Sequence, residues 1–121
     1  MYWVSIKSVE ILPSVYNFAL EKIKTFYQVV PEIKAEIEIL NKNMTEIDWK
    51  TIDIAYIAST TFNEELMKKI YLRAIEMKIG SRVVTLKNPL PDENQMFKIT
   101  NTQEYLMSWG MEKTIFQIKI K

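Results

Sequence analysis

The hydrophobic pattern of the first forty residues predicts a strand, a helix and a second strand. Residues 3–10 alternate loosely and are rich in aromatic and β-branched side chains, which favours a strand. From Pro13 to about residue 29, apolar residues recur every three or four positions, as on one face of a helix. Residues 35–40, AEIEIL, alternate strictly, which is typical of a half-buried strand.

The middle of the chain predicts a buried strand followed by a helix. Residues 52–58 are apolar except for one aspartate, which is typical of a strand buried on both faces of a parallel sheet. The start of the helix has two candidate caps: a capping box formed by Thr61 and Glu64, and Asn63. Gly80 is well placed to end this helix in a left-handed conformation.

The last forty residues are predicted to be mainly β. Residues 81–87 form one β-branched run, and MFKIT, EYLMSW and TIFQIKIK form three shorter ones. Strands that alternate with helices and end in a β tail predict an α/β fold with a Rossmann-like sheet, mostly parallel with an antiparallel C-terminal edge. With 121 residues, the chain is expected to form a single domain over residues 1–121.

Composition excludes several kinds of chemistry. The chain has no cysteine and no histidine, so disulfides, Cys or His metal sites and Ser–His nucleophiles are impossible, and we expect no metal. The net charge of +1 gives no direct signal for nucleic acid or an anionic membrane. No apolar run approaches the roughly 20 residues of a membrane span, and no secretory leader is evident. We therefore expect a nuclear or cytoplasmic protein that is not secreted.

Candidate chemistry lies at the carboxyl ends of the predicted strands, where open α/β sheets bind ligands. Glu10 ends the first strand just before a helix, a position suited to holding ribose hydroxyls, although, taken alone, Glu10 fits a solvated acid beside a helix N-terminus better. Asn43 fits a plain turn residue, and residues 59–61 fit either a helix cap or the floor of a pocket. The aromatic residues, viewed singly, are more typical of a core than of a site.

Several stretches, taken in order, resemble the second half of a class I S-adenosylmethionine-dependent methyltransferase. They are SVEI, MTEIDW, DIAYIASTTFNEELMKKI, GSRVVTLKNPL and MSWG. They are most similar to the non-SET histone-lysine methyltransferase family, the group named for disruption of telomeric silencing, and the likeness extends over nearly the whole chain. The resemblance implies S-adenosylmethionine as cofactor, a protein substrate such as a histone, and methylation of a lysine nitrogen.

The resemblance also implies which residues bind the cofactor. Glu10 matches the acid that holds the ribose, with Ile11 beside it. Asn43 falls where the family usually has an aspartate for the adenine amino group, and Met44 falls where an aromatic residue packs on the adenine. Ala58 replaces an asparagine near the methionine end of the cofactor, so one hydrogen bond is lost there.

The substrate channel implied by the resemblance is aromatic. Phe62, Trp109 and Phe116 match residues that line a narrow channel for the acceptor lysine, with Ser59 nearby, and Phe116 replaces a tyrosine. Such a channel desolvates the lysine and lowers its pKa, and it favours the positive sulfonium by cation–π attraction. No residue is identified as a catalytic acid or base.

One family element is not found in this sequence. The family's first strand and Gly-rich loop precede the ribose acid, whereas seven residues precede Ser8 and the two glycines are Gly80 and Gly110. In the family, that strand lies between the strands that end at Glu10 and at Ala58. We therefore expect a methyltransferase fragment that is inactive alone. The alternative is a non-catalytic, methyltransferase-like interaction module that binds no cofactor.

Overall fold

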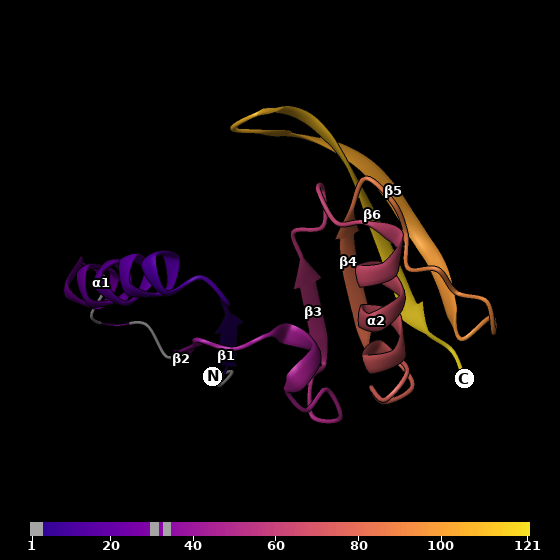
Figure 1. The fold of residues 1–121 in the computed structure, drawn as a ribbon, viewed down its shortest axis with the longest axis horizontal. Coiled ribbons are helices and arrows are strands. Elements are labelled where there is room, and N and C mark those ends of the chain that lie inside the picture. The colour runs from indigo at the N-terminus through magenta and orange to yellow at the C-terminus, as the bar shows by residue number, and fades with distance from the viewer. Residues whose placement is uncertain (1–3, 30–31, 33–34) are drawn as a thin grey trace. The chain divides into compact units, whose positions relative to one another are not determined.

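The computed structural model describes residues 4–29, 32 and 35–121, and it contains two compact units, Met1–Ile47 and Asp48–Lys121 (Figure 1). The first unit has an α-helix between two strands and ends in a short 3-10 helix, and the second has one α-helix and four strands. The elements are β1 Val4–Val9, α1 Pro13–Val29, β2 Ala35–Leu40, η1 Met44–Glu46, β3 Ile54–Ile57, α2 Glu64–Ala74, β4 Arg82–Leu86, β5 Phe97–Met107 and β6 Gly110–Lys119.

In the first unit, β1 and β2 form a parallel pair connected through α1. Their register joins Val4 to Ala35 at one end and Val9 to Leu40 at the other. The hydroxyl of Tyr27 accepts a hydrogen bond from the Ile37 backbone N–H at 3.1 Å, which ties the helix to the second strand. The predicted helix over 13–29 and strand over 35–40 are confirmed, and the first strand is confirmed within the described residues.

This first unit has no core of its own. Among residues 5–29, 32 and 36–47, whose burial the structure describes, none is buried, and Phe18 on α1 is 62% exposed. A two-stranded sheet is at best marginally stable without further packing. Among the described residues, β1 pairs with β2 alone, so its other edge is open. Packing among the described residues of this unit therefore contributes little to its stability.

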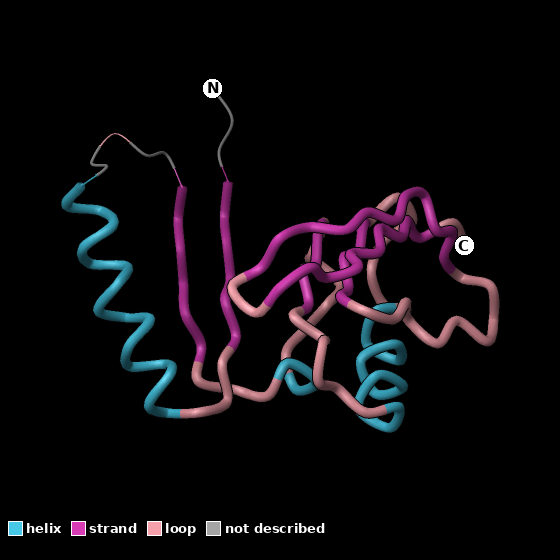
Figure 2. The backbone as a smooth tube through the Cα atoms, turned by 90° about the horizontal axis from the view of Figure 1, so that it is seen from above, coloured by secondary structure: helices cyan, strands magenta, loops and turns pink. Residues whose placement is uncertain are grey.

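The second unit is a four-stranded mixed sheet in the order β3-β4-β6-β5. β3 is parallel to β4, whereas β6 is antiparallel to both β4 and β5, so the predicted antiparallel C-terminal edge is confirmed. Figures 1 and 2 show α2 lying along one face of this sheet. The outer edge of β3 has no partner strand among the described residues.

Alternate residues of β3 differ sharply in burial. Ala55 and Ile57 are buried, whereas Ile54 and Tyr56 are 65% and 61% exposed. Side chains of a strand alternate between its two faces, and α2 covers one of them. The prediction that this strand is buried on both faces is therefore wrong, and the strand is shorter than 52–58. An apolar run by itself does not reveal how many faces are covered.

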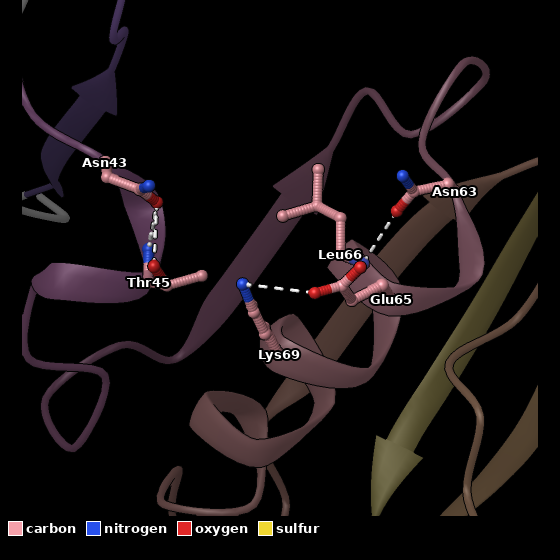
Figure 3. Close-up of polar contacts among 6 residues, drawn as sticks. All are labelled: Asn43, Thr45, Asn63, Glu65, Leu66 and Lys69. Atoms are coloured by element: carbon pink, nitrogen blue, oxygen red, sulfur yellow. Dashed lines mark hydrogen bonds and ion pairs between the residues drawn. The ribbon is translucent and has the colours of Figure 1, made fainter.

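The start of α2 is set by Asn63. Its side-chain oxygen accepts a hydrogen bond from the Leu66 backbone N–H at 2.8 Å (Figure 3). Of the two candidate starts, the capping box at Thr61 is wrong. Figure 3 also shows the pair between Lys69 and Glu65, 3.7 Å apart on an exposed face, where such pairs contribute little to stability.

Gly80 does not end the helix as predicted. The helix ends at Ala74, and the chain then runs through turns to β4. Gly80 has a φ of 92° and donates its N–H to the Lys119 carbonyl at 2.8 Å. A turn that contains the buried Met77 separates Gly80 from the helix, so Gly80 is not its cap. The left-handed conformation of Gly80 instead directs the chain into the sheet.

The C-terminal β runs are organised differently from the prediction. Residues 97–100 of MFKIT and residues 104–107 of EYLMSW belong to one continuous strand, β5, rather than two, and the pairing of β5 with β6 has a register shift between Ile99 and Asn101. Residues 114–119 of TIFQIKIK lie in β6, which begins earlier, at Gly110, and ends at Lys119.

A buried tyrosine fixes the loop that leads into β5. Tyr71 on α2 donates its hydroxyl hydrogen to Asp92 at 2.9 Å, and Asp92 also accepts hydrogen bonds from the backbone N–H groups of Met96 and Phe97, each at 2.8 Å. Burial, and after it the hydrogen bond to Asp92, raises the pKa of Tyr71 above its usual value. This cluster connects the helix to the edge strand.

We expect Asn63→Ala to lower the free energy of unfolding by about 1 kcal/mol, because the first turn of α2 loses its cap. Urea titration followed by circular dichroism measures the change. Thr61→Ala is the matched control and should leave the midpoint in place. Equal losses in the two variants would contradict this assignment of the cap.

We expect the stability of the chain to fall above about pH 10, partly because of Tyr71. An unfolded tyrosine ionises near this pH, whereas folded Tyr71 keeps its proton to higher pH. Its contribution is therefore complete below the unfolded pKa and is lost as the pH rises through the folded pKa.

Urea midpoints measured between about pH 8 and pH 11 test this expectation, and Tyr71→Phe should fall less steeply over that range than the parent chain. Tyr56→Phe, which removes a hydroxyl from an exposed side chain, serves as the control. If Tyr71→Phe and the parent chain show the same slope, Tyr71 does not contribute.

Candidate functional site

The predicted ribose acid, Glu10, lies just beyond β1 in a loop held by hydrogen bonds. Its Oε1 accepts a hydrogen bond from the Leu12 N–H at 3.1 Å, near the start of α1. Asn41 Nδ2 donates to the backbone carbonyls of Glu10 and Ile11, at 2.9 and 3.1 Å. The structure gives Glu10 Oε2 no hydrogen bond to another described residue. The carboxylate is thus positioned near a helix start and keeps an oxygen for a further donor.

Asn41 is a positioning residue that no local feature of the sequence identifies. Its amide reaches across from the end of β2 to the loop after β1. The residues around Asn41 do not predict this contact, because the contact depends on the parallel pairing of β1 and β2, which are distant in the sequence.

Asn43 caps the short helix η1. Its side-chain oxygen accepts hydrogen bonds from the Thr45 N–H at 2.9 Å and the Thr45 hydroxyl at 2.8 Å (Figure 3). An amide oxygen has two lone pairs, and both are engaged here. Asn43 therefore acts in the turn, and an adenine amino group would have to displace one of these bonds. Met44, the first residue of η1, is half-buried, and its contact with adenine stays a prediction.

The small-residue patch after β3 is partly structural. Ala58 is exposed, but Ser59 is 4% exposed and bridges to β4: its Oγ donates to the Leu86 carbonyl at 3.0 Å and accepts from the Leu86 N–H at 2.9 Å. This pair of bonds fixes the end of β3 beside the end of β4. The Ser59 hydroxyl is therefore engaged within the sheet rather than offered to a ligand.

The three predicted channel aromatics lie in different settings within the second unit. Phe62 is half-buried in the loop before α2, and Trp109 is 58% exposed in the turn between β5 and β6. Phe116 is half-buried on β6 and lines a shallow hollow with Val84 and Ile118, on the same sheet face as the exposed Tyr56. The lining of this hollow includes neither Phe62 nor Trp109. A channel shared by all three stays a prediction.

A polar pair that the sequence did not reveal holds Trp109. The indole Nε1 donates a hydrogen bond to Glu112 Oε2 at 3.1 Å, and the Glu112 side chain is buried, with the residue 9% exposed. The turn that brings them together includes Gly110, whose φ is 125°. Sequence reasoning passed over Glu112 because an acid in an alternating strand normally faces solvent.

Two further properties bear on the site. Among the described residues, no group of three or more acidic side chains could hold a metal ion. No helix in the described part of the chain is long and apolar enough to cross a membrane.

No protein-family model matches the chain, and no curated protein matches it in sequence. Solved methyltransferases do match its fold. Magnesium protoporphyrin IX methyltransferase from Synechocystis PCC 6803, solved with bound S-adenosylmethionine, is 8% identical with a TM-score of 0.68, covering 97% of this chain and 70% of that one. An rRNA methylase from Streptococcus thermophilus is 8% identical with a TM-score of 0.62, covering 98% and 87%.

A Streptococcus pneumoniae protein assigned as a tRNA (m1A22) methyltransferase is 12% identical with a TM-score of 0.66, covering 97% of this chain but 54% of that one. It has also been solved in complex with S-adenosyl-L-methionine. At these identities the likeness shows the fold alone. The chain has the α/β fold of S-adenosylmethionine-dependent methyltransferases, and the predicted fold class is confirmed. These three solved structures are named for tetrapyrrole and RNA substrates, not for histones.

Proposed function

We propose that residues 1–121 belong to one methyltransferase-like domain of an S-adenosylmethionine-dependent enzyme, and that this enzyme methylates a lysine nitrogen of a protein. The observation that carries the proposal is the Glu10 carboxylate, at the carboxyl end of a parallel strand, with one oxygen uncommitted. The fold likeness to known methyltransferases supports it.

The residues present fit part of S-adenosylmethionine. Glu10 can accept from a ribose hydroxyl, because a carboxylate oxygen without a partner suits that donor. Ile11 and Met44 supply apolar surface, and Asn43 can meet an adenine amino group only by giving up a bond to Thr45. Ala58 offers nothing to the methionine end, so that end requires groups from elsewhere.

The open strand edges support the view that each of the two sheets is extended by further polypeptide. β1 and β3 each have one parallel neighbour and one edge without a partner among the described residues. Parallel strands are normally buried and paired on both sides, since unpaired backbone groups inside a protein are costly. A strand followed by a Gly-rich loop, supplied from outside these residues, would give β1 such a partner near Glu10.

When bound, S-adenosylmethionine supplies an electrophilic methyl group, and the protein's task is to present the acceptor in line. Phe62, Trp109 and Phe116 provide apolar surface that desolvates an amine and lowers its pKa toward the reactive, neutral form. The weak net charge of +1 offers little attraction for an RNA backbone. A protein amine is therefore the favoured acceptor, and the choice of a histone rests on the family resemblance.

The second candidate, a module that binds no cofactor, is favoured by one observation. The Asn43 oxygen is already occupied by Thr45, and the alanine at position 58 gives no hydrogen bond. If the reading frame begins at Met1 and no strand with a Gly-rich loop is encoded before it, this candidate gains over the first.

We expect the 121-residue chain alone to bind S-adenosylmethionine no more tightly than about 1 mM, because the Gly-rich part of the site is not among its residues. Isothermal titration calorimetry measures this affinity. Micromolar binding would show that these residues form a complete cofactor site and would contradict the expectation.

In the protein expressed from the longest reading frame that contains these residues, we expect Glu10→Ala to weaken S-adenosylmethionine binding by about tenfold or more, since hydrogen bonds to a charged group are lost. Glu36→Ala, at an exposed position on β2, is the control. Transfer of labelled methyl groups to histones, but not to RNA, is expected in the same preparation. Equal affinities for the two variants would count against the site.

A further inference from the structure

The helix α1 carries two apolar stripes on neighbouring sides. The members of the first stripe are half-buried, and they are Tyr16, Ala19, Leu20, Ile23 and Tyr27. Tyr27 of this stripe accepts the hydrogen bond from Ile37 of β2, so the first stripe faces the strand pair. The second stripe is exposed, and we call it the outer stripe. Its apolar members are Val15, Phe18, Phe26 and Val29.

The outer stripe leaves large apolar side chains uncovered. Phe18 is 62% exposed, Phe26 37% and Val29 73%. A contiguous exposed apolar surface of this kind usually marks a place where another element packs. Lys22 lies in the middle of the stripe, and its Nζ is 5.1 Å from the centre of the Phe18 ring. The ammonium group is therefore drawn toward one end of the stripe, over an aromatic face.

The spacing of the outer stripe is symmetric about Lys22. Phe18 and Phe26 lie four positions before and after it, and Val15 and Val29 lie seven positions before and after it. Read in either direction along the helix, the stripe therefore presents the same order of side chains. This symmetry matters for the choice of partner, because a two-fold interface requires each copy to present a surface that complements itself.

We propose that the outer stripe of α1 packs against the same stripe of a second copy of this chain, with the two helices antiparallel and crossing at Lys22. Phe18 of each copy then meets Phe26 of the other, and Val15 lies on the side of Val29. Rows of residues four apart, such as Phe18, Lys22 and Phe26, are the ridges that pack into grooves between helices. The proposal goes beyond the proposed function and involves neither the cofactor nor Glu10.

The surroundings of Lys22 favour this arrangement. A shallow hollow on α1 adjoins the stripe and can receive an aromatic ring; its lining is Asn17, Phe18, Glu21, Lys22 and Thr25. Glu21 lies beside Lys22 at the edge of the stripe, and adjacent residues of a helix do not face each other. At the centre of an antiparallel pair, the two lysines and two glutamates balance in charge, so the crossing point is not repulsive.

The first test is sedimentation equilibrium of the 121-residue chain. We expect the average mass to rise from that of a monomer toward that of a dimer between about 10 μM and about 1 mM, because a small helix interface predicts a dissociation constant on the order of 100 μM. Phe18→Glu should raise this constant at least about tenfold, since it places a charge in the apolar contact.

The matched control is Leu72→Glu, which makes a similar change on α2 at a side chain that is 60% exposed. It should leave the dissociation constant unchanged. If the parent chain stays monomeric up to about 1 mM, or if the two glutamate variants behave alike, the proposal is overturned.

A second test locates the crossing point, and it is clean because the chain has no cysteine. Lys22→Cys places two thiols at the proposed two-fold axis, where the Cα atoms can approach within the roughly 7 Å that a disulfide needs. Mild oxidation should therefore produce covalent dimers. Lys24→Cys makes the same change on the opposite side of the helix and should produce few.

Equal cross-linking of the two cysteine variants overturns the proposal, because contact would then be random. The remaining alternative is that another segment of a longer polypeptide covers the outer stripe. If the protein expressed from the longest reading frame stays monomeric while the 121-residue chain dimerises, that alternative holds and the proposal is overturned. Neither test contains S-adenosylmethionine, so the outcome is separate from that of the Glu10 experiment.

Discussion

The double pairing of β4 is the constraint on which the second unit depends. β4 is hydrogen-bonded to β3 on one edge and β6 on the other, and its Val83 and Thr85 are completely buried. Ile70 of α2 is equally buried, so the helix seals one face of the sheet. The Ser59 bridge to Leu86 extends this order beyond the end of β3. The register imposed on β6 then decides which of its side chains share a face.

The first unit lacks such a constraint. It has one strand pair, a helix without a buried residue among those described, and an open edge on β1. In the loop after β1, the Asn41 amide donates hydrogen bonds to the Glu10 and Ile11 carbonyls. The hydrogen bonds that hold Glu10 in a unit without a core are explained if further polypeptide packs against the loop after β1.

Local pattern was a good guide where a single element decides the outcome. The helix over 13–29 and the strand over 35–40 follow from apolar periodicity, which depends only on the spacing of residues along one element. Pattern failed where two local signals competed, as at Asn63 and Thr61, and where tertiary structure extended or shortened an element. β5 is one strand because its pairing with β6 tolerates a shifted register, which no local window contains.

The sequence by itself determined which kinds of chemical site these residues cannot form, and it determined the order of the helices and strands. A chain without cysteine or histidine and with two glycines cannot build thiolate or imidazole sites or a Gly-rich loop, and periodicity depends only on neighbouring residues. Tertiary structure alone decided the partners: Tyr71 with Asp92, Asn41 with the loop after β1, and Ser59 with Leu86. These partners are more than twenty residues apart, and they meet only because strand pairing and helix packing bring distant segments together.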